Sequence, residues 1–251
     1  MKTNLDKQIA EYVQKGYAKI LTQAEADKSY PRTWYLPIFT VINPKKPSKV
    51  RIVWDAAAKV NGISLNTALL KGPELLGSIA TILQRFRERR IGICGDIREM
   101  FHQIRIKQHD QDSQRFLYRK NPGDNIDTNI MKVMTFGATC SPCSAQYVRN
   151  INASRFNTQY PRAVKAIQEN HYVDDLLDCV NTEEEAMELA KNIRLVHKSV
   201  GFEMRNWLSN SFKVMKMLEN ATTNTSKSLN FSIENPTEKV LEKVLVLVHT
   251  D

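Results

Sequence analysis

The pattern of apolar and polar positions along the chain predicts short helices and strands in mixed order. Residues 4–16 carry apolar side chains at helical spacing and end on Gly16, which predicts an amphipathic helix with a glycine stop. Residues 34–42 and 49–54 are rich in β-branched and aromatic residues, which predicts two strands of a hairpin. The Pro- and Lys-rich loop at the tip of this hairpin carries Lys45, Lys46 and Lys49.

The middle of the chain predicts a helix followed by a buried strand. Pro73 opens a helical pattern that runs to about Arg90. Residues 91–94 then form an apolar strand that leads directly into Asp96. Strand carboxyl ends commonly present catalytic groups, so this aspartate is a candidate site residue. Residues 97–104 are expected to form a compact turn or a short helix.

The second half of the chain alternates strands and helices. Strands are expected at residues 115–118 and 130–136, a hairpin at 171–180, and helices that begin at Ser141, at 161 and after Thr182. The sequence Thr182-Glu-Glu-Glu185 matches a capping box, and Gly201 ends the helix that follows. Residues 239–249 are apolar and predict a further strand or helix.

Two adjacent carboxylates, Asp174 and Asp175, lie between strand-forming residues at the tip of the predicted hairpin 171–180. Their charges repel each other unless a cation lies between them. Mg²⁺ takes oxygen ligands, usually one or two carboxylates together with substrate phosphates. Paired acids are also common in ordinary turns, so the pair predicts either a plain turn or a metal site.

Composition adds a moderate positive charge to this picture. The formal net charge is +9, which suits a surface that binds polyanions and equally suits a basic soluble protein. A hydrophobic content of 42% is enough for a packed core. No apolar run reaches membrane-spanning length and the amino terminus lacks a signal-peptide core, so we expect an intracellular protein with no membrane partner. The four cysteines are then expected to be reduced thiols.

Three features occur in one order: Asp96 with Phe101 five residues on, the glycine-then-helix segment from Phe136-Gly137 to Ser141-Pro142, and Tyr172-Val-Asp-Asp175. This order resembles the palm of a reverse transcriptase. The resemblance narrows to the Pao/BEL class of LTR retrotransposon polyproteins and covers residues from about 5 to about 215. The motifs that carry it are Trp34-Tyr-Leu-Pro37, Val50-Arg-Ile-Val-Trp-Asp55, Ser64-Leu-Asn66, Gly72-Pro-Glu-Leu-Leu76, Arg85-Phe-Arg87, the segment 96–104, Arg115-Phe-Leu-Tyr118 and Gly201-Phe202.

The resemblance implies an α+β, right-hand polymerase fold with fingers and palm subdomains. Its palm sheet would be antiparallel with helices on one face, and the thumb would be missing or truncated. The implied division places the fingers at 1–90 and 106–140, and the palm at 91–105 and 141–215. Residues 216–251 would form a linker and a truncated start of the primer-grip region.

The activity that the resemblance implies is RNA-directed DNA synthesis on a template-primer of RNA or DNA with deoxynucleoside triphosphates. Asp96, Asp174 and Asp175 would be the catalytic residues and the ligands of two Mg²⁺ ions, for which Mn²⁺ is a possible substitute. Phosphoryl transfer depends mainly on positioning and on charge stabilisation. In a parent polyprotein, protease, RNase H and integrase domains would lie next to this domain. The resemblance also implies that the protein is located in a retrotransposon particle in the cytoplasm.

The resemblance also implies a nucleotide pocket and a nucleic-acid surface. Phe101 would be the aromatic gate that excludes a 2′-hydroxyl, with a core phenylalanine as the alternative. Arg51 would contact the incoming nucleotide, with a solvated strand residue as the alternative. The nucleotide-binding set is Arg51, Ile97, Phe101, Phe136 and Gly137. The nucleic-acid-binding set is Lys45, Lys46, Lys49 and Tyr172.

Four other features are not assigned to the site. The pair Cys140-x-x-Cys143 resembles half a zinc site, but no second pair is spaced to complete it. His171 is expected to be structural, and Glu99 and Asp178 are expected to be exposed or paired nearby.

Two positions depart from the family pattern. Asn206 stands where family members usually carry a lysine, and Val246 stands where they carry a glycine at the primer grip. We therefore expect either a polymerase domain of a fragmentary element or a catalytically silent nucleic-acid-binding remnant of the same fold. A generic binding protein, in which the aspartate pair is only a turn, is the third alternative.

Overall fold

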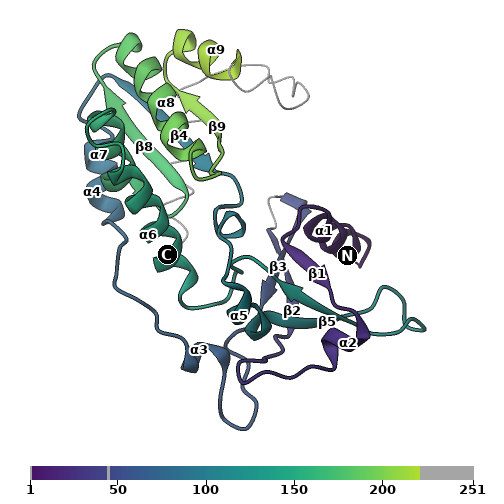
Figure 1. Ribbon diagram of the computed structural model, residues 1–251. Coiled ribbons are helices and arrows are strands. Elements are labelled where there is room, and N and C mark those ends of the chain that lie inside the picture. Colours follow the sequence, from purple (N-terminus) through teal and green to yellow (C-terminus); the bar gives the residue numbers. More distant parts are fainter. Residues whose placement is uncertain (1, 44–45, 221–251) are drawn as a thin grey trace. The chain divides into compact units, whose positions relative to one another are not determined.

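The computed structural model describes residues 2–43 and 46–220, and the chain divides into two compact units (Figure 1). The first unit contains residues 1–73 and 101–145, and the second contains residues 74–100 and 146–251. The predicted division into fingers and palm is functional and stays a prediction. The apolar segment predicted at 239–249 lies outside the described residues. No helix in the described part of the chain is long and apolar enough to cross a membrane.

The first unit is built from a three-stranded antiparallel sheet, in the order β1-β6-β5, and from the β2-β3 hairpin. The pairing of Ile38 with Trp54 and of Val41 with Arg51 confirms the predicted hairpin. The strand expected at 130–136 lies earlier, at Asp127–Met131, because β6 pairs with β1 and β5 there. The elements of this unit are α1 (Lys2–Gln14), β1 (Ala18–Ile20), α2 (Gln23–Ala26), β2 (Ile38–Asn43), β3 (Lys46–Trp54), α3 (Leu65–Ala68), α5 (Gln108–Gln111), η2 (Asp112–Gln114), β5 (Arg115–Tyr118) and β6 (Asp127–Met131).

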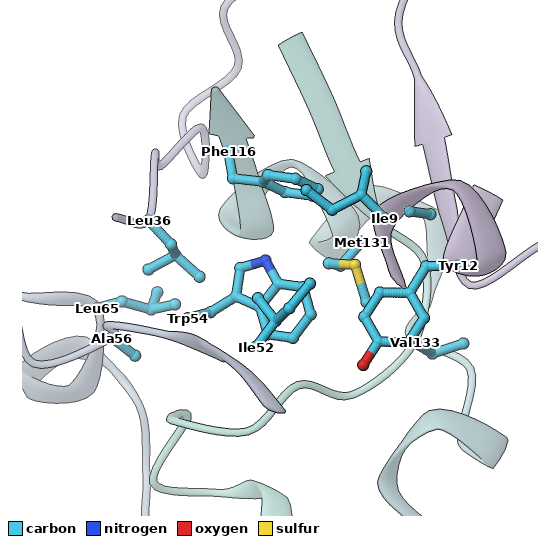
Figure 2. Packing of buried hydrophobic residues seen from close by; sticks show 11 residues of the cluster. Ile9, Tyr12, Leu36, Ile52, Trp54, Ala56, Leu65, Phe116, Met131 and Val133 are labelled. Carbon is cyan, nitrogen blue, oxygen red and sulfur yellow. The ribbon is translucent and has the colours of Figure 1, made fainter. Parts of the chain in front are cut away.

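Trp54, at the end of β3, lies at the centre of the first unit's core. Its side chain is fully buried, and Figure 2 shows its ring enclosed by apolar side chains from several elements. The rings of Tyr12 and Phe116 each lie 5.9 Å from it between centroids. Burying aromatic rings of this size contributes strongly to stability, so this cluster fixes the end of β3. The other buried members are Ile9, Ala18, Leu36, Ile52, Ala56, Leu65, Met131 and Val133.

The second unit is built on a four-stranded antiparallel sheet in the order β7-β8-β4-β9. Figure 1 shows β8, β4 and β9 side by side, with α8 along the sheet. Two further elements join the units in sequence: η1 (Met100–Gln103) and α6 (Ser141–Ser154). The elements of the second unit are α4 (Ile79–Arg85), β4 (Ile91–Ile97), α7 (Pro161–Glu169), β7 (His171–Tyr172), β8 (Asp175–Val180), α8 (Glu183–Lys198), β9 (Met204–Ser209) and α9 (Phe212–Asn220).

Helices cover both faces of this sheet, a detail that the prediction of helices on one face did not include. On one face Ile82 of α4 packs against Cys94 and Leu177. On the other, Arg162 of α7 reaches Asp178, whose side chain points away from that of Leu177 because successive strand residues alternate. Residues on both faces of the central strand β4 are buried, which agrees with cover on both sides.

Local sequence signals account for most of the helix boundaries. The predicted capping box is present: the Thr182 hydroxyl accepts a hydrogen bond from the Glu185 backbone N–H at 3.2 Å. The helix expected from Pro73 to about Arg90 is much shorter, Ile79–Arg85. Ser78 caps its start, because its hydroxyl accepts from the backbone N–H of Thr81, and Phe86 ends it.

Candidate active site

The central pair of strands in the second unit brings Asp96 and Asp175 opposite each other. β4 and β8 are antiparallel, and their register pairs Asp96 directly with Asp175 and Cys94 with Leu177. Because side chains alternate along a strand, Asp96 lies on the same face as Cys94, and Asp175 lies on the same face as Leu177. Cys94 and Leu177 pack in one cluster, so the two aspartates share that face. Asp96 lies inside β4, one residue earlier than its end.

Asp174 lies in the two-residue turn that joins β7 to β8. Tyr172 pairs with Asp175, so Val173 and Asp174 form the turn, as the sequence predicted for the hairpin tip. The backbone carbonyl of Asp174 accepts a hydrogen bond of 2.9 Å from the N–H of Ile97, the residue after Asp96. The turn is therefore fixed to the strand that carries Asp96. Val173 has a φ of 52°, a left-handed conformation that is costly for a β-branched residue.

The carboxylate of Asp96 is held by two consecutive residues of β9. The Nε of Arg205 donates to one oxygen at 3.0 Å, and the Nδ2 of Asn206 donates to the other at 2.7 Å. The β4–β9 register shifts between Cys94 and Asp96, and Asn206 has a φ of 50°. A bulge of this kind sets two residues of one strand against one residue of its partner. Both side chains therefore reach the same aspartate.

The chemistry of these aspartates suits a hard divalent cation. Carboxylate oxygens are the ligands that Mg²⁺ prefers, and strand register brings the three residues to one end of the sheet. In the described part of the chain, however, no three acidic, histidine or cysteine side chains are grouped as a ready metal site. The Asp96 oxygens are engaged by Arg205 and Asn206 instead. A cation at this position would share or replace these hydrogen bonds.

Replacing Arg205 by methionine is therefore expected to tighten Mn²⁺ binding. The Arg205 cation competes with a metal ion for the same carboxylate, and its side chain is 33% exposed. A partly exposed ion pair contributes about 1 kcal/mol, so the expected gain is about threefold to tenfold in Mn²⁺ affinity. Titration of the free-Mn²⁺ electron paramagnetic resonance signal measures it.

Arg98→Met is the matched control for this prediction, because Arg98 pairs with Glu203 at 3.2 Å and is similarly exposed. The control is expected to leave the affinity for Mn²⁺ within twofold of the wild type. Unchanged or weaker Mn²⁺ binding by Arg205→Met, in a folded protein, contradicts the competition.

Three residues predicted to bind the nucleotide lie together in the first unit. The rings of Phe101 and Phe136 are 4.9 Å apart between centroids and tilted, and Gly137 follows directly. Arg51 lies exposed in β3 of the same unit. Ile97 is fully buried in β4 of the second unit, with the three aspartates. The assignment of these five residues to a nucleotide pocket stays a prediction.

Gly137 has a structural reason to be glycine that the sequence did not reveal. Its φ is 115°, and a Cβ atom there would lie 1.9 Å from the carbonyl oxygen of Trp54. The N–H of Trp54 donates to the carbonyl of Phe136 at 3.0 Å, so the two backbones run in contact. Asn66 fixes the same segment from another side, since its Nδ2 donates to the Gly137 carbonyl and its Oδ1 accepts from the N–H of Thr139. In the sequence, Ser64-Leu-Asn66 counted only as a motif of the family resemblance, so this contact was not predicted.

The predicted nucleic-acid contacts are spread over both units. Lys46 and Lys49 lie in β3, and Lys45 lies outside the described residues. Tyr172 belongs to β7 and is partly buried, where it packs against the Ile82 cluster. Their role toward nucleic acid stays a prediction.

The features that the sequence left outside the site have other partners. His171 is buried and its Nε2 lies 3.3 Å from the Nε2 of His197. Asp178 is buried and accepts two hydrogen bonds from the Arg162 guanidinium, at 2.9 and 2.6 Å, and this carboxylate raises the pKa of Arg162. Cys140 and Cys143 are free thiols, and burial raises the pKa of Cys140. A raised thiol pKa does not favour the reactive thiolate.

Solved structures with a similar fold are reverse transcriptases. A foamy viral protease–reverse transcriptase in complex with double-stranded DNA matches with a TM-score of 0.60 and 16% identity over 81% of this chain. A foamy viral protease–reverse transcriptase in complex with an RNA/DNA hybrid matches with a TM-score of 0.59 and 16% identity over 81% of this chain. A mutant of the prototype foamy virus protein matches with a TM-score of 0.59 and 13% identity. The chain spans 30%, 23% and 23% of the lengths of these three.

This likeness confirms the predicted polymerase fold. The family model described as reverse transcriptase (RNA-dependent DNA polymerase) matches residues 44–220. The chain therefore belongs to the reverse transcriptase family and is a nucleotidyltransferase by descent. Divalent metal ions are generally used in this family. A search of curated proteins found no match.

Proposed function

We propose that this chain forms the fingers and palm of an RNA-directed DNA polymerase from a Pao/BEL-type LTR retrotransposon. The reaction would add deoxynucleotides to the 3′-hydroxyl of a primer, with Asp96, Asp174 and Asp175 as catalytic residues. The observation that carries this proposal is the strand register: Asp96 pairs with Asp175, and Ile97 holds the carbonyl of Asp174. The register brings three aspartates, from two strands and one turn, to one end of the sheet.

The chain's own residues would contribute position and charge. Asp96 and Asp174 would be the main ligands of two divalent ions, Mg²⁺ or Mn²⁺, and Asp175 would help to hold one of them. When bound, these ions supply Lewis acidity for the attacking hydroxyl and for the leaving pyrophosphate. Arg205 and Asn206 hold the Asp96 carboxylate in place before an ion arrives. Such fixed geometry is a large part of catalysis in phosphoryl transfer.

The first unit would supply four of the five proposed nucleotide-binding residues, and Ile97 belongs to the second unit. Phe101 would lie under the sugar and reject a 2′-hydroxyl, and its contact with Phe136 would fix the ring. Arg51 would bind the triphosphate through its guanidinium fork. Gly137 lies against the Trp54 backbone, so it would hold the Phe136 segment at a defined position rather than leave it flexible.

Nucleic acid is the proposed partner. The similar foamy viral structures hold double-stranded DNA or an RNA/DNA hybrid, and this chain carries a net charge of +9. Lys45, Lys46, Lys49 and Tyr172 are the proposed contacts. The retrotransposon origin would place the chain beside protease, RNase H and integrase domains, in a cytoplasmic particle.

Primer extension on an RNA template, with Mg²⁺ or Mn²⁺ and deoxynucleotides, tests this proposal. We expect template-dependent incorporation, and binding of the template-primer that weakens steeply as salt rises. Ribonucleotides in the same assay test Phe101: Phe101→Val should accept them, while the wild type should not. Absence of incorporation at high protein concentration with both ions would overturn the catalytic proposal.

A catalytically silent nucleic-acid-binding remnant is the second candidate, and one observation favours it. Both oxygens of Asp96 already accept hydrogen bonds, from Arg205 and from the residue that replaces the usual lysine, Asn206. This candidate predicts salt-dependent binding of the template-primer without any incorporation. Loss of both binding and incorporation would leave only a generic binding protein.

A further inference from the structure

Arg149, in α6, is a buried arginine that has no acidic partner among the described residues. Only 2% of the Arg149 surface is exposed to solvent. Among residues 2–43 and 46–220, no carboxylate lies within ion-pair distance of it. Burial lowers its pKa to about 10, so it remains charged at neutral pH. A buried charge without a counterion is costly and calls for a specific reason.

The partner of Arg149 is the turn that carries the aspartates. Its Nη1 donates to the carbonyl of Val173 at 3.0 Å, and its Nε donates to the side chain of Asn150 at 3.1 Å. Val173 is the residue with a φ of 52°, where valine is strained. The peptide bond that Arg149 holds is the one directly before Asp174. The hydrogen bond therefore lies where the backbone most needs support.

Two tethers fix this turn from different elements. Arg149 of α6 holds the carbonyl of Val173, and Ile97 of β4 holds the carbonyl of Asp174. With both carbonyls bound, the peptide planes on either side of Asp174 have a defined orientation. The directions in which Asp174 and Asp175 leave the backbone then follow from these planes.

The two neighbouring histidines do not serve as counterions for Arg149. His171 and His197 form a buried pair with their Nε2 atoms 3.3 Å apart. Burial chiefly, and the charge of Arg149 secondly, lower the pKa of His197 to about 3. His197 is therefore neutral at pH 7, and it adds no second positive charge beside Arg149.

We propose that Arg149 is the positioning residue of the Asp174–Asp175 turn, and that it determines how tightly the turn's carboxylates bind divalent ions. The part that concerns ions rests on the proposed function. The part that concerns the turn rests only on the contacts of Arg149 with Val173.

Arg149→Met tests both parts, because methionine fills a similar volume without a donor or a charge. We expect Mn²⁺ affinity, measured by electron paramagnetic resonance, to fall about tenfold. Hydrogen exchange of the peptide that covers residues 171–177 should become about tenfold faster. Arg149→Lys keeps the charge and a donor, so it should recover both to within about threefold of the wild type.

Arg194→Met is the matched control in the same unit. Arg194 also donates to a backbone carbonyl, that of Leu218 at 3.0 Å, and burial also lowers its pKa. We expect the control to leave Mn²⁺ affinity and exchange of the turn within twofold of the wild type, even where it lowers thermal stability. Equal effects of both variants on the turn would overturn the proposal, because a lost buried charge would then explain them.

A second background keeps the test decisive. Val173→Gly removes the strain that Arg149 offsets. In that background, Arg149→Met should change Mn²⁺ affinity and exchange of the turn by less than about threefold. Should Arg149→Met alone not fold, Arg149→Gln carries the comparison, and unchanged exchange at the turn overturns the proposal. If the wild type binds no Mn²⁺ and extends no primer, the proposed function fails, and the exchange experiment still decides the role of Arg149.

Discussion

Asp174→Asn is expected to reduce primer extension by about a thousandfold or more, because divalent-ion stabilisation of the transition state is worth several kcal/mol. Asparagine has nearly the shape of aspartate, so the turn between β7 and β8 should keep its hydrogen bond from Ile97. The loss would therefore arise from the missing charge. Single-nucleotide incorporation under rapid-quench conditions, with Mg²⁺ and with Mn²⁺, measures it.

Asp178→Asn is the control for this variant, because Asp178 lies on β8, only four residues after Asp174. It is paired with Arg162 on the opposite face of the sheet, so its loss should cost about 1–3 kcal/mol of stability. Incorporation should persist at temperatures where the control is folded. If Asp174→Asn extends primers at a rate close to the wild type, the assignment of Asp174 as a metal ligand is wrong.

Gly137→Ala is expected to lower the free energy of unfolding of the first unit by about 3–5 kcal/mol, because overpacking and backbone strain act together. The added Cβ would lie 1.9 Å from the Trp54 carbonyl oxygen, and backbone atoms cannot yield as a flexible side chain can. The φ of 115° adds a conformational cost for alanine. Urea unfolding followed by hydrogen exchange of peptides from each unit measures the loss.

Gly16→Ala provides the comparison within the same unit. Gly16 has a φ of 71°, but nothing lies within 4 Å of its added Cβ. Gly16→Ala has the conformational cost without the clash, so we expect it to lower the free energy of unfolding by about 1–2 kcal/mol. Equal losses from the two substitutions would mean that the contact between Gly137 and Trp54 is less close than described.

Local signals account for the parts of the site that the sequence predicted. The Tyr172–Asp175 hairpin, the cap at Thr182 and the strand before Asp96 depend on residues near each other in the chain. The overall polymerase fold followed from the order of three motifs rather than from any single one. These predictions held because each motif carries its own conformational preference.

The remaining features depend on contacts between distant residues. Arg205 and Asn206 reach Asp96 only because β9 has a bulge and a residue with positive φ. No local preference of Met204-Arg205-Asn206-Trp207 indicates which strand it pairs with or where the register shifts. Likewise, nothing in the local sequence distinguishes Arg149 from other polar residues of a helix, because its role depends on the contact with the turn at Val173. The helix predicted from Pro73 was too long because apolar spacing continued past the cap at Ser78.

The order of strands in the aspartate sheet has a consequence for synthesis on the ribosome. β4 is a central strand, yet both of its neighbours, β8 and β9, are translated later. At about 5–20 residues per second, the apolar segment Ile91–Ile97 waits roughly 5–20 s before β9 emerges. Pairings this distant in sequence form slowly, and an unpaired apolar strand is prone to association. In the nascent chain, β4 and its aspartate therefore stay without their strand partners until β8 and β9 have been made.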